Sequence, residues 1–214
     1  MVSRGASNRG ALLPCPHNIH TVKFSTLIRA PALVFVLGGC ALGAYDPAPS
    51  IAPRPISDED IMYFTEHALM VPVDGLSPSD LRDSFDQSRS GGRTHRAIDI
   101  LAPRGTPIVA AISGHVLRLR QNAAGGITVY LIDDSRRYVY YYAHLDHYAD
   151  AITEGLAVRQ GFVIGYVGTS GNAPPDTPHL HFQAMRIANG QRDWWNGTPV
   201  DVRPFMTKRG TAIQ

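Results

Sequence analysis

Two short segments of this chain hold histidine and aspartate side chains at spacings suited to binding a metal ion. His95 and Asp99 are four residues apart, at the start of a short apolar run, while His179 and His181 flank a single leucine. Residues two apart in a β-strand point to the same face, so His179 and His181 are expected to face the same way. Two imidazoles and one carboxylate form a tripod that suits Zn²⁺ and leaves a fourth tetrahedral position for water. Water bound there has its pKa lowered towards about 7, which favours hydrolytic chemistry.

Each of these segments is weak evidence when taken alone. A His-x-His pair in a strand is more often structural or superficial than metal-binding. The combination is stronger because a further histidine, His144, follows an aromatic strand at a position where a metallopeptidase would need one. Two histidines and a carboxylate could also hold non-haem iron in an oxygenase. That alternative explains neither His144 nor His179.

The composition is that of a globular protein. The chain has 214 residues, enough for one domain with a core and a leader or linker, with 44% hydrophobic and 18% charged residues. Residues 1–39 hold four of the 20 basic residues and no acidic residue, so 16 basic residues face 18 acidic ones in the rest. A near-neutral body argues against binding a phosphate backbone, and no nucleic-acid partner is expected.

Residues 1–39 are predicted to be a lipoprotein signal peptide. Lys23 and Arg29 precede an apolar stretch that is too short to span a bilayer, which takes roughly 20 residues. Leu37-Gly38-Gly39-Cys40 resembles the lipobox of bacterial lipoproteins, which implies that Cys40 is acylated. With Ala41 after it, the resemblance implies sorting to the outer membrane, with the body on the periplasmic face. Plain secretion or a membrane anchor are the alternatives.

The remaining chain divides into a tether, a helix and a β domain. Residues 40–56 are a proline-rich tether, and residues 57–70 a short helical segment with Ser57 as its N-cap. Residues 71–206 have a sequence pattern typical of β structure, and residues 207–214 are expected to form a C-terminal tail. Six candidate strands are 108–112, 116–120, 127–132, 138–142, 163–167 and 179–185. Short strands at this spacing predict a mainly β fold, an antiparallel sheet or sandwich with a short N-terminal helix.

Three motifs in order resemble those of the M23 family of zinc endopeptidases, the lysostaphin and LytM group. The family pattern is His-x-Gly-x-Asp, then Tyr-x-His-Leu, then His-Leu-His. This chain has His95…Asp99, Tyr142-Ala143-His144-Leu145 and His179-Leu180-His181. The likeness covers roughly residues 71–206 and implies a LytM-like fold, the duplicated hybrid motif.

The resemblance also implies roles for individual residues. His95, Asp99 and His181 match the zinc ligands, while His144 and His179 match the two histidines that position the metal-bound water and the developing oxyanion. Which of these two is the general base stays open. The family's glycine between the first two ligands is Ala97 here. If that position needs a positive φ, alanine costs about 1 kcal/mol of strain, whereas an extended backbone makes the change harmless.

Two aromatic features carry weaker expectations. In a regular strand Tyr142 would share the face of His144, which makes it one candidate for substrate contact, with a place in the core as the alternative. Trp194-Trp195 is expected to pack within a loop rather than to bind glycan.

The function implied by the resemblance is a zinc-dependent endopeptidase that cuts stem peptides or cross-links of bacterial peptidoglycan in the cell envelope. Sorting to an outer membrane would imply D-Ala–diaminopimelate cross-links as the substrate. The alternative is a non-catalytic LytM-type regulator that binds and activates cell-wall amidases. Relatives of that kind have lost metal ligands, whereas all five site positions are filled here.

Overall fold

The computed structural model describes residues 56–188 and 193–208. The predicted signal peptide, Cys40 and nearly all of the predicted tether therefore lie outside the described residues. Within the described ranges, no helix is both long enough and apolar enough to cross a membrane.

Helix α1 (Asp58–Glu66) begins where the sequence predicts but is shorter. The Ser57 hydroxyl accepts a hydrogen bond from the Asp60 backbone N–H, and the Asp60 carboxylate accepts one from the Ser57 N–H, which forms a capping box. The helix was expected to extend to residue 70. Instead Leu69–Met70 forms strand β1, which pairs in parallel with β11 (Met206–Thr207). The chain leaves the helix because Leu69 is fully buried in this two-stranded pairing.

The predicted antiparallel β architecture is confirmed. In the described part of the chain nine strands form one sheet, and every neighbouring pair in it is antiparallel. The strands are β2 (Ile98–Leu101), β3 (Pro107–Val109), β4 (Gly114–Asn122), β5 (Gly126–Asp133), β6 (Tyr138–Tyr148), β7 (Ala157–Val158), β8 (Val163–Val167), β9 (His179–Arg186) and β10 (Thr198–Val200). Four short 3₁₀ turns lie between them: η1 (Pro78–Asp80), η2 (Ser90–Gly92), η3 (Trp194–Asn196) and η4 (Arg203–Phe205).

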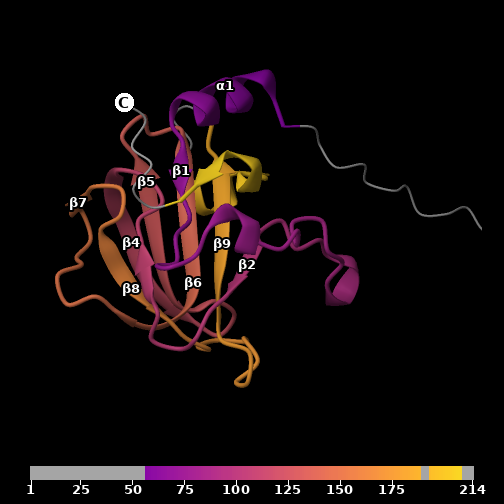
Figure 1. Cartoon of the computed structure of the whole chain (residues 1–214), viewed down its shortest axis with the longest axis vertical. Coiled ribbons are helices and arrows are strands. Elements are labelled where there is room, and N and C mark those ends of the chain that lie inside the picture. Colours follow the sequence, from indigo (N-terminus) through magenta and orange to yellow (C-terminus); the bar gives the residue numbers. More distant parts are fainter. Residues whose placement is uncertain (1–55, 189–192, 209–214) are drawn as a thin grey trace, which may run out of the picture. The chain divides into compact units, whose positions relative to one another are not determined.

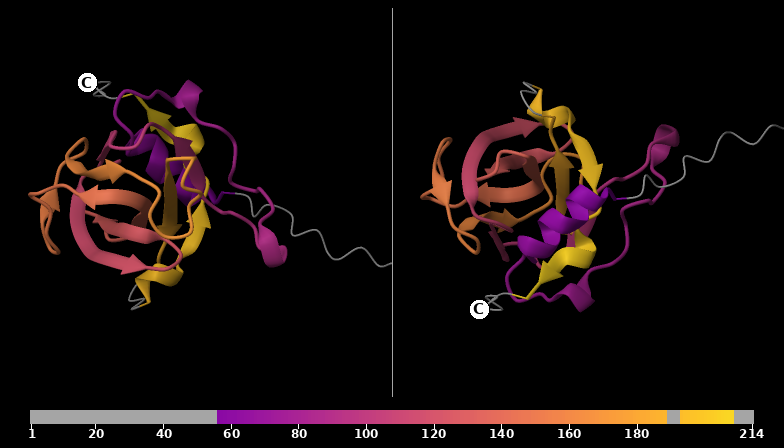
Figure 2. Two further views of the ribbon diagram at one scale, coloured as in Figure 1. Left: turned by 90° about the horizontal axis from the view of Figure 1, so that it is seen from below. Right: turned by 90° about the horizontal axis from the view of Figure 1, so that it is seen from above.

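Strand β6 lies at the centre of the sheet, as Figure 1 shows. It pairs with β5 along one edge, while its other edge pairs first with β9 and then with β8. The strands on either side curl around a common core, as the views along them show (Figure 2). The largest fully buried side chains come chiefly from β6 and β9, where Tyr138, Tyr140, Tyr142 and Phe182 pack together.

Helix α1 lies across one end of this sheet (Figure 1). The Asp60 carboxylate is buried there, where it accepts hydrogen bonds from Tyr138 Oη (2.7 Å) and from the Arg186 guanidinium (2.9 Å). Tyr138 begins β6 and Arg186 ends β9, so one helical carboxylate joins the two central strands. The pairing of β6 with β9 continues towards the middle of the sheet, where Ala143 lies opposite His181.

Candidate functional site

Three of the predicted site residues meet beside β2 and β9. His95 Nε2 lies 2.9 Å from Asp99 Oδ1 and 3.0 Å from His181 Nδ1, and His181 Nδ1 lies 3.1 Å from Asp99 Oδ1. A tetrahedral metal with bonds of about 2.0–2.1 Å holds its donor atoms roughly 3.3 Å apart. The three donor atoms in this structure, at 2.9–3.1 Å from one another, are slightly closer together than that. Two imidazole nitrogens and a carboxylate oxygen thus fit a divalent metal ion in type, number and spacing.

The strand register explains why Asp99 and His181 meet. Strand β2 pairs with β9 so that Asp99 lies directly opposite His181. Their neighbours Ile98, Ile100, Leu180 and Phe182 alternate to the other face and are buried in the core. Both ligands therefore project from the same face of two adjacent strands.

Ser84 fixes the third ligand, His95. The Ser84 carbonyl accepts a hydrogen bond from His95 Nδ1 (2.8 Å), which leaves Nε2 as the nitrogen facing the site. The Ser84 hydroxyl accepts a hydrogen bond from the Asp99 backbone N–H (3.0 Å). One buried serine thus orients two of the three donors, and such supporting contacts are usual around metal ligands.

Hydrogen bonds and charge keep the Asp99 carboxylate ionised. Burial alone would raise its pKa, but hydrogen bonds from His181 and His95 outweigh burial and hold that pKa far below the usual range. Arg89 also pairs with Asp99 Oδ2. Burial lowers the pKa of His181, and the Asp99 carboxylate partly opposes this effect. An ionised carboxylate is the protonation state in which such a tripod binds a metal ion.

His144 and His179 lie beside this triangle. The two rings have centroids 5.0 Å apart, and the His144 ring lies 5.8 Å from that of His181. His144 Nδ1 bonds to the Ser170 carbonyl and His179 Nδ1 to the Thr177 carbonyl, each at 2.8 Å. Because a carbonyl only accepts, Nδ1 carries the proton in both rings and Nε2 stays available. Burial lowers the pKa of His144 to about 4, so this imidazole is neutral at pH 7.

A bulge in β6 decides which aromatic residue faces the site. Between the pairs Val129–Tyr142 and Ile127–Leu145, β5 advances by two residues and β6 by three. His144 adopts a φ of +65° at this bulge, and its N–H donates to the Gly125 carbonyl. The alternation of faces is reversed at this point, so the expectation that Tyr142 shares the face of His144 is wrong.

Tyr142 is fully buried, and its hydroxyl accepts a hydrogen bond from the Ala111 N–H (3.0 Å). Tyr141 lies on the site face instead, with its ring centroid 5.9 Å from that of His181. The period-two rule failed here because it assumes a regular strand.

Ala97 needs no positive φ. The residue with a positive φ between the first two ligands is Arg96, at +56°. Ala97 is 1% exposed and has an ordinary backbone conformation, so the replacement of the family's glycine causes no conformational strain. Of the two alternatives drawn from the sequence, the harmless one holds.

An open cleft of about 640 Å³ gives access to the site. All five predicted residues line it: His95, Asp99, His144, His179 and His181. One wall comes from the loop between η1 and β2, and the other from the loop before β9, which includes Asn172 and Thr177. The cleft is large enough for several residues of an extended peptide.

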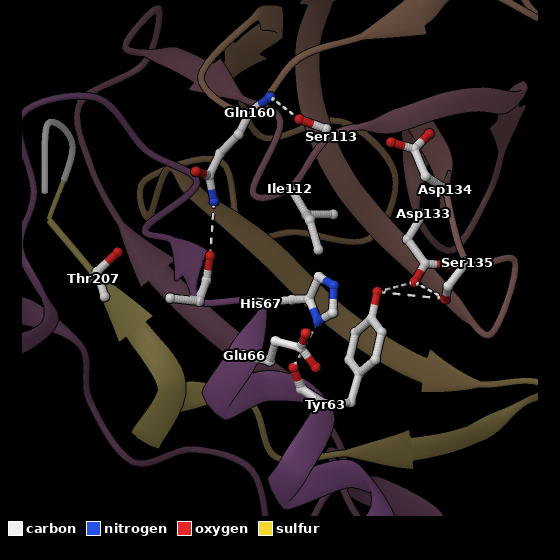
Figure 3. A pocket seen from close by; sticks show the side chains of 11 residues that line it. Tyr63, Glu66, His67, Ile112, Ser113, Asp133, Asp134, Ser135, Gln160 and Thr207 are labelled. Carbon is white, nitrogen blue, oxygen red and sulfur yellow. Dashed lines mark hydrogen bonds between the residues drawn. The ribbon is translucent and has the colours of Figure 1, made fainter. Parts of the chain in front are cut away.

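A second cavity, of about 450 Å³, lies between α1 and the turn that joins β5 to β6 (Figure 3). Its buried carboxylate, Asp133, already accepts hydrogen bonds from the Tyr63 and Ser135 hydroxyls and from the backbone of Arg137 and Tyr138. These bonds fasten the helix to the turn. We therefore assign this cavity a structural role. It lies at the start of β6, where Tyr138 is six residues before His144.

Four residues of the site escaped the sequence analysis as contributors. Ser84 and Ser170 orient His95 and His144 through backbone carbonyls, which leave no signal in a side-chain pattern. Tyr141 was hidden by the bulge. Arg89 reaches Asp99 across a loop, a contact that no local spacing could indicate.

Antiparallel β structure with a two-histidine, one-carboxylate centre in an open cleft defines a candidate metal-dependent hydrolase. The sequence profile of Peptidase family M23 matches residues 93–202, just over half of the chain. The chain belongs to this family. The resemblance seen in the three motifs is thereby confirmed.

Two curated relatives show the extent of the likeness. The chain is 35% identical over 136 residues to the L-Ala--D-Glu endopeptidase of Bacillus subtilis (strain 168), which covers 60% of this chain and 40% of the relative. It is 40% identical over 99 residues to the DD-carboxypeptidase/endopeptidase Mpg of Neisseria meningitidis serogroup B (strain ATCC BAA-335 / MC58), covering 46% and 21% respectively. The chain thus spans less than half the length of each.

A solved structure supports the fold. Csd3 of Helicobacter pylori superimposes with a TM-score of 0.51 at 25% sequence identity, covering 65% of this chain and 35% of that one. The predicted LytM-like fold agrees with this likeness.

Proposed function

We propose that this protein is a zinc-dependent endopeptidase that hydrolyses peptide bonds in the stem peptides or cross-links of bacterial peptidoglycan. The observation that carries the proposal is the triangle of His95, Asp99 and His181 donors, 2.9–3.1 Å apart, within a cleft open to a polymer. The family and the named activities of the two relatives support the choice of substrate.

His95, Asp99 and His181 would hold the zinc ion. When bound, zinc polarises a carbonyl group and lowers the pKa of a coordinated water. His144 and His179 are fixed through Nδ1, so each offers Nε2 to the cleft, where it can take a proton from water or donate one to the leaving amine. The Arg89 guanidinium lines the same cleft, and the Tyr141 ring packs against that of His181.

The test is mass spectrometry of purified sacculi digested with the wild-type protein, His181→Ala and His147→Ala, with the zinc content of each measured. His147 is the matched control because its side chain is 56% exposed and bonds to Asp146 rather than to a site residue. We expect about one zinc per chain and released muropeptides for wild type and His147→Ala, and neither for His181→Ala. Products that persist in His181→Ala would overturn the ligand assignment. A zinc-free wild type that releases nothing would favour the amidase regulator.

We also propose that Cys40 carries a lipid that anchors the protein in the cell envelope, on the periplasmic face of the outer membrane. Support comes from the basic flank, the short apolar run and Leu37-Gly38-Gly39-Cys40. A tether would raise the local concentration of enzyme at its polymer substrate. Metabolic labelling with radioactive palmitate should mark wild type and not Cys40→Ala. Label retained by Cys40→Ala would refute the anchor site.

A further inference from the structure

One wall of the cleft is a β-hairpin-like excursion formed by residues 85–96. It is held by backbone hydrogen bonds, among them Arg89 N–H to the Arg93 carbonyl (2.8 Å), and by the isolated bridge between Ser88 and Thr94. The turn at its tip uses Gly91 and Gly92, both with positive φ. This backbone places Arg89 and Arg93 across from each other. The excursion with η2 at its tip protrudes from the body of the sheet (Figure 1).

The cleft wall carries an excess of positive charge. Arg82, Arg89 and Arg93 all line the cleft, and Asp99 is the one carboxylate among its lining residues. Arg89 pairs with Asp99. Among the described residues, neither Arg82 nor Arg93 pairs with a carboxylate, and the Arg93 side chain donates only a 3.4 Å hydrogen bond to the Ser90 carbonyl.

The acidic residues of the same loop are engaged elsewhere. Asp83 pairs with Arg203 (2.8 Å), and Asp86 pairs with Arg96 (2.6 Å). Neither aspartate lines the cleft. The loop therefore neutralises the guanidinium of Arg96, which is not among the cleft-lining residues, and leaves those of Arg82 and Arg93 without a counter-charge. Such an arrangement fits an anionic ligand better than a neutral one.

We propose that Arg82, Arg89 and Arg93 form a carboxylate-binding subsite that selects stem peptides with a free carboxylate next to the scissile bond. The inference rests on the proposed function and narrows its substrate. Guanidinium groups bind carboxylates through two parallel hydrogen bonds. The contact between Arg89 and Asp99 shows that this wall reaches the metal centre, so a substrate carboxylate bound to it lies close to the reacting bond.

The proposed subsite would distinguish two kinds of peptide in peptidoglycan. A stem peptide with a D-glutamyl residue carries a free α-carboxylate, whereas a bridge of glycine residues carries no charge along its length. The subsite would favour the first. Amidation of the D-glutamyl α-carboxylate keeps the shape of the peptide but removes its charge, and so isolates the contribution of the arginines.

The experiment compares two synthetic stem peptides that differ only in this group, a carboxylate or a carboxamide. We expect wild type to hydrolyse the carboxylate peptide with a kcat/KM roughly 10-fold or more higher, the effect expected of hydrogen bonds to a charged group. The preference should fall at high ionic strength. In Arg82→Gln/Arg93→Gln it should shrink to less than about 3-fold, chiefly through a higher KM for the carboxylate peptide. Arg89 is left intact because it contacts a metal ligand.

Arg159→Gln is the matched control, since it removes the same charge from an exposed arginine that does not line the cleft. It should keep the wild-type preference. Binding of both peptides to His144→Ala by calorimetry gives a readout that needs no turnover, and the carboxylate peptide should bind more tightly there too. Equal hydrolysis and equal binding of the two peptides, with sacculi still digested, would overturn the subsite and leave the proposed function standing. Failure to digest sacculi, with the binding preference present, would overturn the function and keep the subsite.

Discussion

At the scale of single residues, His144 combines a proposed catalytic role with an unfavourable backbone conformation. Its φ of +65° is in the left-handed region, where a Cβ atom is disfavoured by about 1 kcal/mol or more. The residue is held there because its N–H and its ring each bond to a carbonyl, those of Gly125 and Ser170. Strain of this kind persists where neighbouring structure fixes the residue, and it is frequent at functional sites.

The strain can be measured with two variants that both remove the imidazole. His144→Gly should be more stable than His144→Ala by about 1 kcal/mol, because glycine tolerates a positive φ and alanine does not. Both should lose at least about 100-fold in peptide hydrolysis yet keep their zinc, since His144 is not one of the ligands. Urea unfolding, hydrolysis assays and metal analysis supply the three readouts. An alanine variant as stable as the glycine variant would show that position 144 is not strained.

At the scale of secondary-structure elements, the position of the site residues depends on contacts between loops and strands that are distant in the sequence. The start of β5 and the loop after β8 touch so closely that a Cβ on Gly126 would lie 2.2 Å from Ser170 Oγ. That contact holds the carbonyl to which His144 is bonded. Glycine at this position thus lets two segments approach and thereby positions a site histidine.

Helix α1 is fastened at the other end of the sheet by Asp60. Burial raises the pKa of this carboxyl, but hydrogen bonds from Ser57 and Tyr138 and the charge of Arg186 outweigh burial and lower the pKa below its ordinary value. A pKa that is lower in the folded state means that ionised Asp60 stabilises the fold above the unfolded value. This contribution is lost as the pH falls through the folded pKa.

Asp60→Asn should therefore reduce the free energy of unfolding by about 2 kcal/mol at pH 7, because it removes the charge that pairs with Arg186 and replaces one of two accepting oxygens with an NH2 donor. The difference from wild type should be unchanged at about pH 5 and should narrow below about pH 4. Urea unfolding of both proteins at these pH values checks the expectation. A difference that stays constant down to pH 3 would show that the ionisation of Asp60 does not contribute.

At the scale of the whole molecule, the candidate metal centre joins three separate segments. His95 comes from the loop between η1 and β2, Asp99 from β2 and His181 from β9. A bound ion would therefore link this loop to the sheet. An ion that binds the folded state and not the unfolded chain stabilises the fold by mass action.

Zinc at 100 times its dissociation constant should add about 2.7 kcal/mol, or roughly 5–10 °C in Tm for a domain of this size. Calorimetry with and without a chelator measures the shift. Wild type and His147→Ala should show it, whereas His181→Ala should melt at the same temperature in both conditions. A chelator-dependent Tm in His181→Ala would place the stabilising ion elsewhere.

The sequence by itself determined the class of fold and the membership of the candidate site. Short apolar and aromatic runs at regular spacing predicted the central strands. The three motifs named five residues that the folded chain brings to one cleft. The sequence also predicted where α1 begins, because the N-cap is formed by local hydrogen bonds between Ser57 and Asp60.

Tertiary structure alone decided three other features. The bulge at His144 turned Tyr142 into the core and Tyr141 towards His181, because the bulge depends on how β6 pairs with β5. The end of α1 at Glu66 was set by the pairing of β1 with β11, from the two ends of the domain. The arginine wall exists because Asp83 and Asp86 find partners elsewhere in the fold. Each is a contact between distant segments, and local spacing carries no record of such contacts.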